Sequence, residues 1–142
     1  MPRKVVQPTA GMMVPLGPYS HATVVTGGAL VFLGGQVASD KNGKLVGKDD
    51  LKAQLDQVME NIRLALAAAG ASYRDVVQAR IFTTRCHEFM ALMKYRCEKW
   101  PDFWGSKTTG VDSPATTCIG VTQLWDEAML EIDCIAQIPA AK

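Results

Sequence analysis

Long apolar segments are missing from the 142-residue sequence. No uninterrupted apolar run reaches the roughly 18 residues that a membrane-spanning helix needs. The amino terminus contains Arg3 and Lys4 but lacks the apolar stretch of about 7 to 15 residues that defines a secretion signal. We therefore expect a cytoplasmic protein with no membrane partner.

An excess of one charge is also missing. The chain has 15 Lys and Arg residues against 14 Asp and Glu residues, which gives a formal net charge of +1. Domains that bind nucleic acids usually carry a basic patch, because they neutralise phosphates. The longest basic run here is Arg3-Lys4. We expect no nucleic-acid partner.

Cysteine and histidine are few, with four cysteines and two histidines. The cysteines form no CxxC pair and are widely spaced, so we expect reduced thiols. Cys86 and Cys97 share one face of a predicted helix, but a rise of about 1.5 Å per residue separates them by roughly 16 Å. That distance is too long for one ion, and His21 and His87 do not complete a ligand set. We expect neither a metal nor another cofactor.

The composition is typical of one globular domain. Hydrophobic residues make up 48% of the chain and charged residues 20%. A chain of this length can bury roughly two thirds of its unfolded surface. No internal repeat or low-complexity tract divides the sequence. We expect a single domain over residues 1–142, with an irregular or flexible segment over residues 1–14.

Glycine and proline residues separate short periodic segments in the first half of the chain. Residues 19–26 and 30–36 flank Gly27-Gly28, which favours a hairpin because glycine tolerates the positive φ angles of tight turns. Residues 50–69 place apolar side chains at spacings of three and four, which predicts an amphipathic helix. Asp49 or Asp50 can cap its start, and Gly70 ends it.

The second half of the chain predicts one more helix and three more strands. Residues 75–84 are rich in β-branched side chains and form a third strand. A second helix covers residues 86–100 and ends before Pro101, and residues 101–113 form a loop. Residues 115–123 and 128–136 form a last hairpin. The order ββαβαββ predicts an α+β fold with two helices on one face of a mixed sheet.

The register of the last hairpin assigns its side chains to two faces. A turn near residues 124–125 sets Cys118 opposite Glu131 and Thr116 opposite Asp133. These four side chains would then share one face of the sheet, away from the helices. A mixed polar face without helices needs a cover, and other subunits are a natural one.

Several short motifs in a fixed order resemble the Rid family, which is also called YjgF. They are Gly17-Pro18-Tyr19, Phe32-Leu33-Gly34-Gly35-Gln36, a helix ending in Ala-Ala-Ala-Gly, Pro114-Ala115-Thr116-Thr117-Cys118 and Leu130-Glu131-Ile132-Asp133. The resemblance covers about residues 15–138. It implies a chorismate-mutase-like protomer and a homotrimer that binds small molecules in three clefts between subunits.

The sequence departs from the deaminating members of that family at two positions. Thr116 stands where those members carry an arginine that holds the substrate carboxylate, and Met93 aligns with an asparagine. A threonine hydroxyl cannot replace a charge-assisted contact worth about 1.5 to 3 kcal/mol. We therefore expect little activity on 2-iminopropionate. Arg80 could supply a cation from another direction, although it is also typical of a surface or interface arginine.

The remaining family positions predict the site. Glu131 is the candidate catalytic residue, because a carboxylate can orient the water that attacks an imine carbon. Its alternative role is an ion pair between subunits. Tyr19 would lie at the cleft rim or bury its ring at an interface. Cys118 would shape the pocket, because no His or Lys is placed to form a thiolate.

Three functions are compatible with these residues. The first is a deaminase-like or hydrolase-like enzyme that acts on an imine, an enamine or an arylamine-derived substrate. The second is a non-catalytic trimer that binds a metabolite. The third, ribonuclease activity, is disfavoured by the near-neutral charge of the chain and by the lack of a histidine-rich catalytic set.

Overall fold

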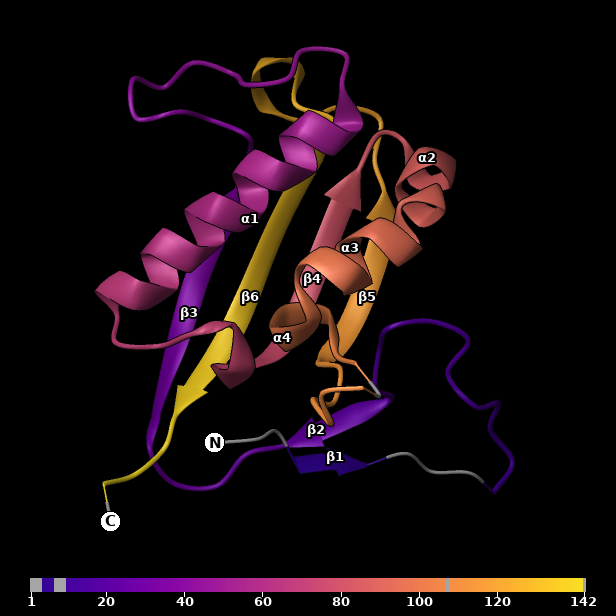
Figure 1. Cartoon of the computed structure of the whole chain (residues 1–142), viewed down its shortest axis with the longest axis vertical. Helices are drawn as coiled ribbons and strands as arrows, with labels where there is room; N and C mark the ends of the chain where they lie inside the picture. Colours follow the sequence, from indigo (N-terminus) through magenta and orange to yellow (C-terminus); the bar gives the residue numbers. More distant parts are fainter. Residues whose placement is uncertain (1–3, 7–9, 107, 142) are drawn as a thin grey trace.

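A computed structural model describes residues 4–6, 10–106 and 108–141 of the chain. Its centre is a four-stranded mixed sheet with the order β3-β6-β4-β5 (Figure 1). The strands are β3 Ala29–Gln36, β6 Leu130–Ile138, β4 Val76–Thr83 and β5 Ala115–Gly120. Strand β6 is antiparallel to both β3 and β4, whereas β4 and β5 are parallel. The predicted α+β class with a mixed sheet is confirmed.

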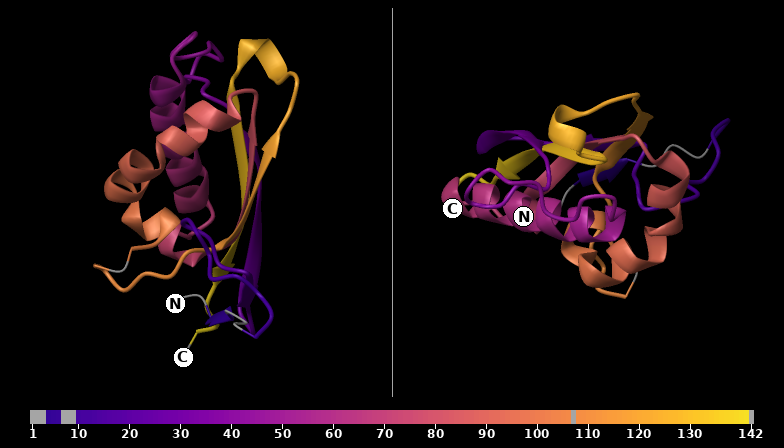
Figure 2. Two further views of the ribbon diagram at one scale, coloured as in Figure 1. Left: turned by 90° about the vertical axis from the view of Figure 1, so that its right-hand side faces the viewer. Right: turned by 90° about the horizontal axis from the view of Figure 1, so that it is seen from above.

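The α-helices all lie on one face of this sheet, and the other face carries no α-helix of the described residues (Figure 2). They are α1 Leu51–Ala68, α2 Cys86–Ala91, α3 Met93–Lys99 and α4 Pro101–Trp104. The described residues also form two short 3-10 helices, η1 Tyr73–Asp75 and η2 Trp125–Glu127. The hydrophobic core fills the space between the helices and the sheet, and Phe103 and Trp104 are completely buried in it. No helix of the described residues has the length and apolar character to span a membrane.

Helix α1 agrees with its prediction. The Asp50 carboxylate accepts a hydrogen bond of 3.0 Å from the amide of Ala53, which caps the first turn. Gly70 adopts a φ of 80° directly after the helix, a conformation that ends helices without steric cost. The stripe predicted from the apolar spacing is the buried side, with Leu55, Val58, Ile62 and Leu66 completely inaccessible to solvent.

The predicted helix over residues 86–100 is wrong as a single element. It is divided at Leu92 into α2 and α3, and Pro101 begins α4 instead of preceding a loop. Proline fits the first position of a helix because its missing N–H has no partner there. The loop therefore starts at Gly105, and it contains a short antiparallel bridge between Ser106 and Val111.

The predicted first hairpin is also wrong. Strand β2, Ala22–Val24, pairs with β1, Lys4–Val6, in a separate two-stranded sheet, and β3 pairs with β6. Gly27 and Gly28 do adopt positive φ angles of 66° and 69°. At Gly28, however, an added Cβ would lie 2.1 Å from the Ile138 carbonyl oxygen, so this glycine permits a close crossing over β6. Strand β1 lies inside the segment 1–14 expected to be irregular, and residues 1–3 and 7–9 lie outside the described residues.

The last hairpin does not form either, and this correction changes the site. Strands β5 and β6 are not neighbours, because β4 lies between them. Cys118 pairs with Ile81, and Glu131 pairs with Phe82. The connection includes positive φ angles of 49° at Asp126 and 60° at Glu127, so it is not a two-residue hairpin turn. Alternation along the sequence predicts the two faces of each strand but not its neighbours.

Candidate active site

A cavity of about 300 Å³ lies between β5, helices α2 and α3, and the segment 16–19. Its described lining combines apolar side chains with a few polar groups: Leu16, Gly17, Pro18, Tyr19, Ile81, Met90, Met93, Arg96, Thr116 and Cys118. Four predicted site residues, Tyr19, Met93, Thr116 and Cys118, are therefore brought together. Arg96 is the lining residue that the sequence prediction missed.

Thr116 and Cys118 face the helices from β5. The Thr116 hydroxyl donates a hydrogen bond of 2.9 Å to the Pro114 carbonyl, so its proton is engaged and its oxygen can only accept from a ligand. Burial raises the pKa of the half-buried Cys118 thiol, and the neighbouring Cys86 thiol raises it further. A thiol of this kind is neutral near pH 7, which supports a shaping role over a nucleophilic one.

Arg96 projects from α3 into the core side of the cavity. Its residue surface is only 3% exposed. The guanidinium carbon lies 4.3 Å from the centroid of the Phe89 ring and 4.6 Å from that of the Trp104 ring. The Nε and Nη1 atoms are buried and have no hydrogen-bond partner among the described residues. Burial lowers the pKa of Arg96, but an arginine keeps its charge in proteins.

The sequence did contain a signal for Arg96. Phe89, Leu92, Met93 and Trp100 are apolar residues of the segment predicted as a helix over residues 86–100, and Arg96 lies on the same helical face, four residues after Leu92 and four before Trp100. A charged residue within an apolar stripe is a buried cation or a break in the helix. The structure shows the first of these.

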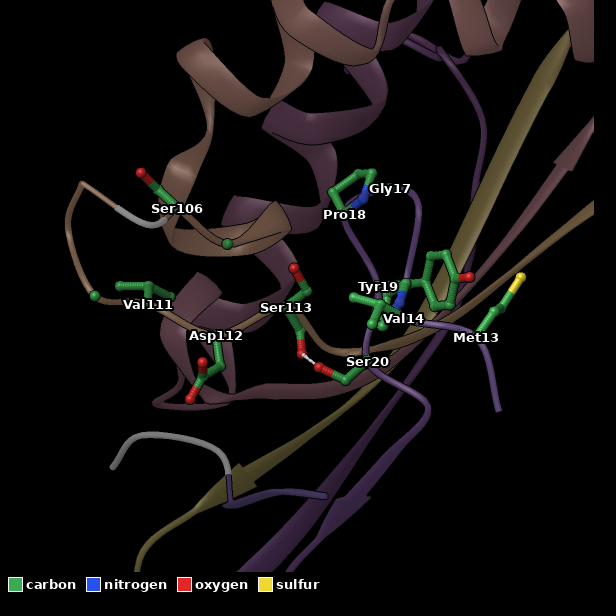
Figure 3. Close-up of a pocket in the computed structure, with 13 residues that line it drawn as sticks. Met13, Val14, Gly17, Pro18, Tyr19, Ser20, Ser106, Val111, Asp112 and Ser113 are labelled. Carbon is green, nitrogen blue, oxygen red and sulfur yellow. Dashed lines mark hydrogen bonds between the residues drawn. The ribbon is translucent and has the colours of Figure 1, made fainter. Parts of the chain in front are cut away.

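The segment that carries Tyr19 is held against the start of β5. The amide of Ser20 donates to the Pro114 carbonyl at 3.1 Å, and the Ser20 hydroxyl donates to the Ser113 carbonyl at 2.6 Å (Figure 3). The Tyr19 ring meets the His21 ring edge to face, with centroids 5.7 Å apart. These contacts fix the outer wall of the cavity.

A second hollow of about 420 Å³ shares residues 17–19 with the first (Figure 3). The loop 105–113 forms much of its lining, and Asp112 is the only charged side chain among the described residues that line it. Its described lining residues include no cation for an anionic ligand and none of the predicted site residues except Tyr19. We therefore place the candidate site in the smaller cavity.

Glu131 and Arg80 lie on the opposite face of the sheet. Thr116 pairs with Ala79, and Cys118 pairs with Ile81. Because Ala79 and Ile81 are buried beneath the helices, Thr116 and Cys118 face the helices as well. The predicted shared face of Thr116, Cys118, Glu131 and Asp133 is thus wrong. It depended on a hairpin that does not form.

Both residues on that open face have close neighbours. Arg80 donates two hydrogen bonds to Asp133, from Nε at 3.0 Å and from Nη2 at 2.5 Å. This pair raises the pKa of Arg80 and neutralises the charge that Arg80 could have supplied to a ligand. The alternative interpretation, a surface or interface arginine, agrees with this pairing. The Glu131 carboxylate lies over Gly35, where an added Cβ would be 2.8 Å from Oε2. Within one protomer, neither residue lines the cavity.

The open face also exposes apolar side chains. Phe32 on β3 is 70% exposed and Leu30 is 49% exposed. Phe32 pairs with the half-buried Ile135, and the Arg80 guanidinium lies 5.6 Å from the centroid of the Phe82 ring. A sheet face with exposed aromatic and aliphatic side chains is typical of a protein interface.

The part of the chain that the structure describes contains no set of metal ligands. No group of three or more His, Cys, Asp or Glu side chains there could hold an ion. Cys86, Cys97, Cys118 and Cys134 are all free thiols.

Comparisons with known proteins agree over nearly the whole chain. Residues 10–138 match the family model described as Endoribonuclease L-PSP. RutC family protein PH0854 of Pyrococcus horikoshii is 33% identical over 123 residues, which cover 86% of this chain and 88% of the relative. RutC family protein slr0709 of Synechocystis sp. is 29% identical over 140 residues, which cover 98% and 99% of the two chains.

A solved structure extends the likeness to three dimensions. YyfB of Yersinia pestis, described as a protein of unknown function of the conserved Rid family, superposes with a TM-score of 0.78. It is 35% identical in sequence, and the match covers 97% of this chain and all of that chain.

Proposed function

We propose that this chain, which belongs to the Rid (YjgF, RutC) family, hydrolyses a small imine, enamine or arylamine-derived substrate in a cleft between subunits. The observation that carries the proposal is the cavity that joins Tyr19, Met93, Thr116 and Cys118. Its volume of about 300 Å³ suits a small molecule and lies at the lower end of the usual range for ligand pockets.

The position of Glu131 supports a site built from two subunits. Its carboxylate lies on the open sheet face, whereas the cavity lies on the helix side. A site that uses both must bring the open face of one protomer to the cavity edge of another. The exposed Phe32 and Leu30 give that face an apolar surface to bury. A closed cyclic homotrimer with three equivalent clefts satisfies this requirement.

The proposed reaction converts an imine and water into a carbonyl compound and ammonia. Glu131 of one subunit accepts a proton from water as the water oxygen bonds to the imine carbon. Protonated Glu131 returns that proton to the imine nitrogen, which gives a carbinolamine. The hydroxyl proton of the carbinolamine then passes to the nitrogen as the C–N bond breaks, which releases ammonia and leaves the carbonyl compound. An enamine first becomes an imine by gaining a proton at carbon and losing one from nitrogen. Thr116 and Cys118 border the substrate, and Tyr19 closes the rim.

Two other functions remain as alternatives. A non-catalytic trimer that binds a metabolite fits the same cavity, because the described residues of a single protomer place no carboxylate in it. Ribonuclease activity is suggested by the description of the matching family model. It is less consistent with the formal net charge of +1 and with a cavity of this small size.

The deciding experiment compares ammonia release by the wild type, Glu131→Gln and Glu98→Gln. Imines are generated in the assay from several amino acids by an amino-acid oxidase. We expect Glu131→Gln to lower the rate of ammonia release by a factor of about 10² to 10⁴, which is the usual contribution of a general base. Glu98 is exposed on α3, so its substitution controls for the lost charge.

Light scattering of each variant reports whether the trimer persists. A trimeric Glu131→Gln protein with full turnover would remove Glu131 from the mechanism. Saturable ligand binding without turnover by the wild type would favour the metabolite-binding trimer. Degradation of RNA by stringently purified protein would favour the third function.

A further inference from the structure

Arg96 is a buried cation without a counter-ion among the residues that the structure describes. Its residue surface is 97% buried, and two of its three guanidinium nitrogens lack a hydrogen-bond partner among the described residues. The described residues that line the cavity with it include no Asp or Glu. Buried charges in proteins are normally paired, because an unpaired charge loses its hydration without compensation.

The aromatic rings around Arg96 explain part of its environment. The guanidinium stacks over Phe89 and Trp104, and these contacts orient its plane. Both rings are completely buried, so the group is held in one place. Rings do not satisfy the N–H donors, however, so Nε and Nη1 stay buried without a hydrogen-bond partner among the described residues. Arginine presents them in a fork that fits the two oxygens of a carboxylate.

We propose that Arg96 is the anion-binding residue of the cavity and that its ligand is a carboxylate with an apolar body. This inference rests on the proposed function, because it concerns the same cavity. The cation comes from helix α3, on the opposite wall from Thr116 of β5. Arg96 supplies from the helix layer the positive charge that Thr116 cannot supply from the sheet.

The rest of the lining defines the apolar body of the ligand. Met90, Met93 and Leu16 surround the part of the cavity away from the sheet, and Leu16 is 82% exposed at its edge. Methionine side chains adapt to ligands of different shape. A ligand whose body is a single methyl group would leave this methionine-lined wall uncovered, whereas a ligand with a branched or aromatic body would cover it. The Thr116 oxygen can accept a hydrogen bond from an imine or amine N–H of the ligand.

Binding of matched acid and amide probes tests the proposal on the assembled wild-type protein. The probes are 4-methylpentanoate and benzoate, each compared with its neutral carboxamide by calorimetry. A charge-assisted contact predicts at least about tenfold tighter binding of each acid than of its amide. Equal affinities, or no binding of either acid at millimolar concentrations, would overturn the proposal.

Substitution of Arg96 assigns the preference to this residue. Arg96→Met removes the charge and keeps a side chain of similar length for the aromatic rings. We expect it to lose the preference for the acid and to melt at the same or a higher temperature without ligand, because an unpaired buried charge is removed. Arg63→Met, an exposed substitution on α1, controls for net charge and must retain the preference.

The possible outcomes separate a binding role from a structural one. A lower melting temperature with an unchanged acid preference would make Arg96 a structural part of the core and refute the proposal. If Arg96→Met does not fold, Arg96→Lys serves in its place and must reduce the preference, because an ammonium lacks the bidentate fork.

These measurements do not depend on turnover. Acid preference in an inactive protein would therefore refute the hydrolase and keep this site. Turnover of imines by a protein without acid preference would refute the Arg96 site and keep the hydrolase.

Discussion

Gly35→Ala should disable the proposed catalytic carboxylate without touching the cavity. Gly35 lies at the register shift between Leu33 and Gln36 on β3, and its φ is outside the left-handed region, so alanine fits the backbone. The added Cβ would lie 2.8 Å from both Cδ and Oε2 of Glu131. The carboxylate must therefore move by several tenths of an ångström or change its rotamer.

The expected effect on stability is small. Alanine in a strand gains about 0.5 to 1 kcal/mol over glycine, and a displaced glutamate rotamer costs about 0.5 to 1.5 kcal/mol. These contributions nearly cancel, so the melting temperature should shift by no more than about 4 °C. A misplaced catalytic group, by contrast, can lower the rate about 10²-fold. We expect kcat to fall by that order while KM changes little.

Ammonia release and melting curves of Gly35→Ala and Gly34→Ala provide the assay. Gly34 is the matched control, since an added Cβ there meets no heavy atom within 4 Å and its φ is also outside the left-handed region. Light scattering must give the same mass for both variants. If trimeric Gly35→Ala keeps wild-type turnover, the position of Glu131 over Gly35 has no part in catalysis.

Two further predictions concern assembly and pH. Phe32→Glu should abolish the proposed trimer and the proposed ammonia release, because it places a charge on the open sheet face. Leu64→Glu, on the 52% exposed Leu64 of α1, should leave the mass unchanged. A trimeric Phe32→Glu would exclude that face from the interface. Burial raises the pKa of Cys134 from 9.0 to about 12. The contribution of this thiol to the free energy of unfolding is therefore fully present below pH 9. It is lost as the pH rises toward 12, by about 1.4 kcal/mol per pH unit, because the unfolded chain ionises first. Urea midpoints between about pH 8 and about pH 11 should fall less steeply in Cys134→Ala; equal slopes would contradict this assignment.

The helices and strands that carry a strong local pattern could be predicted from the sequence. Helix α1 has a regular apolar stripe, an Asp50 cap and a Gly70 stop, and each of these acts within a few residues. Strand pairing is different, because it depends on residues far apart in the chain. Nothing local to β5 distinguishes an antiparallel partner in β6 from a parallel partner in β4.

The same limit applies to the candidate site. Tyr19, Met93, Thr116 and Cys118 were identified by motif and meet in one cavity, although the hairpin expected to position Thr116 and Cys118 does not exist. Glu131 was assigned to their face only through that hairpin. Motifs preserve which residues are used together. They do not say on which side of a sheet, or in which subunit, those residues lie.

The cation was missed for a related reason. Thr116 drew attention to the sheet wall of the cavity, and Arg80 was considered as a cation that could act from another direction. Arg80 is engaged by Asp133 on the far face, whereas Arg96 reaches the cavity from the helix layer. A carboxylate can be held from any wall of a closed pocket, because attraction between charges depends on distance and burial and not on the element that supplies the charge. In the proposed site, the anion-binding residue therefore lies on helix α3 and not on the strand that carries Thr116.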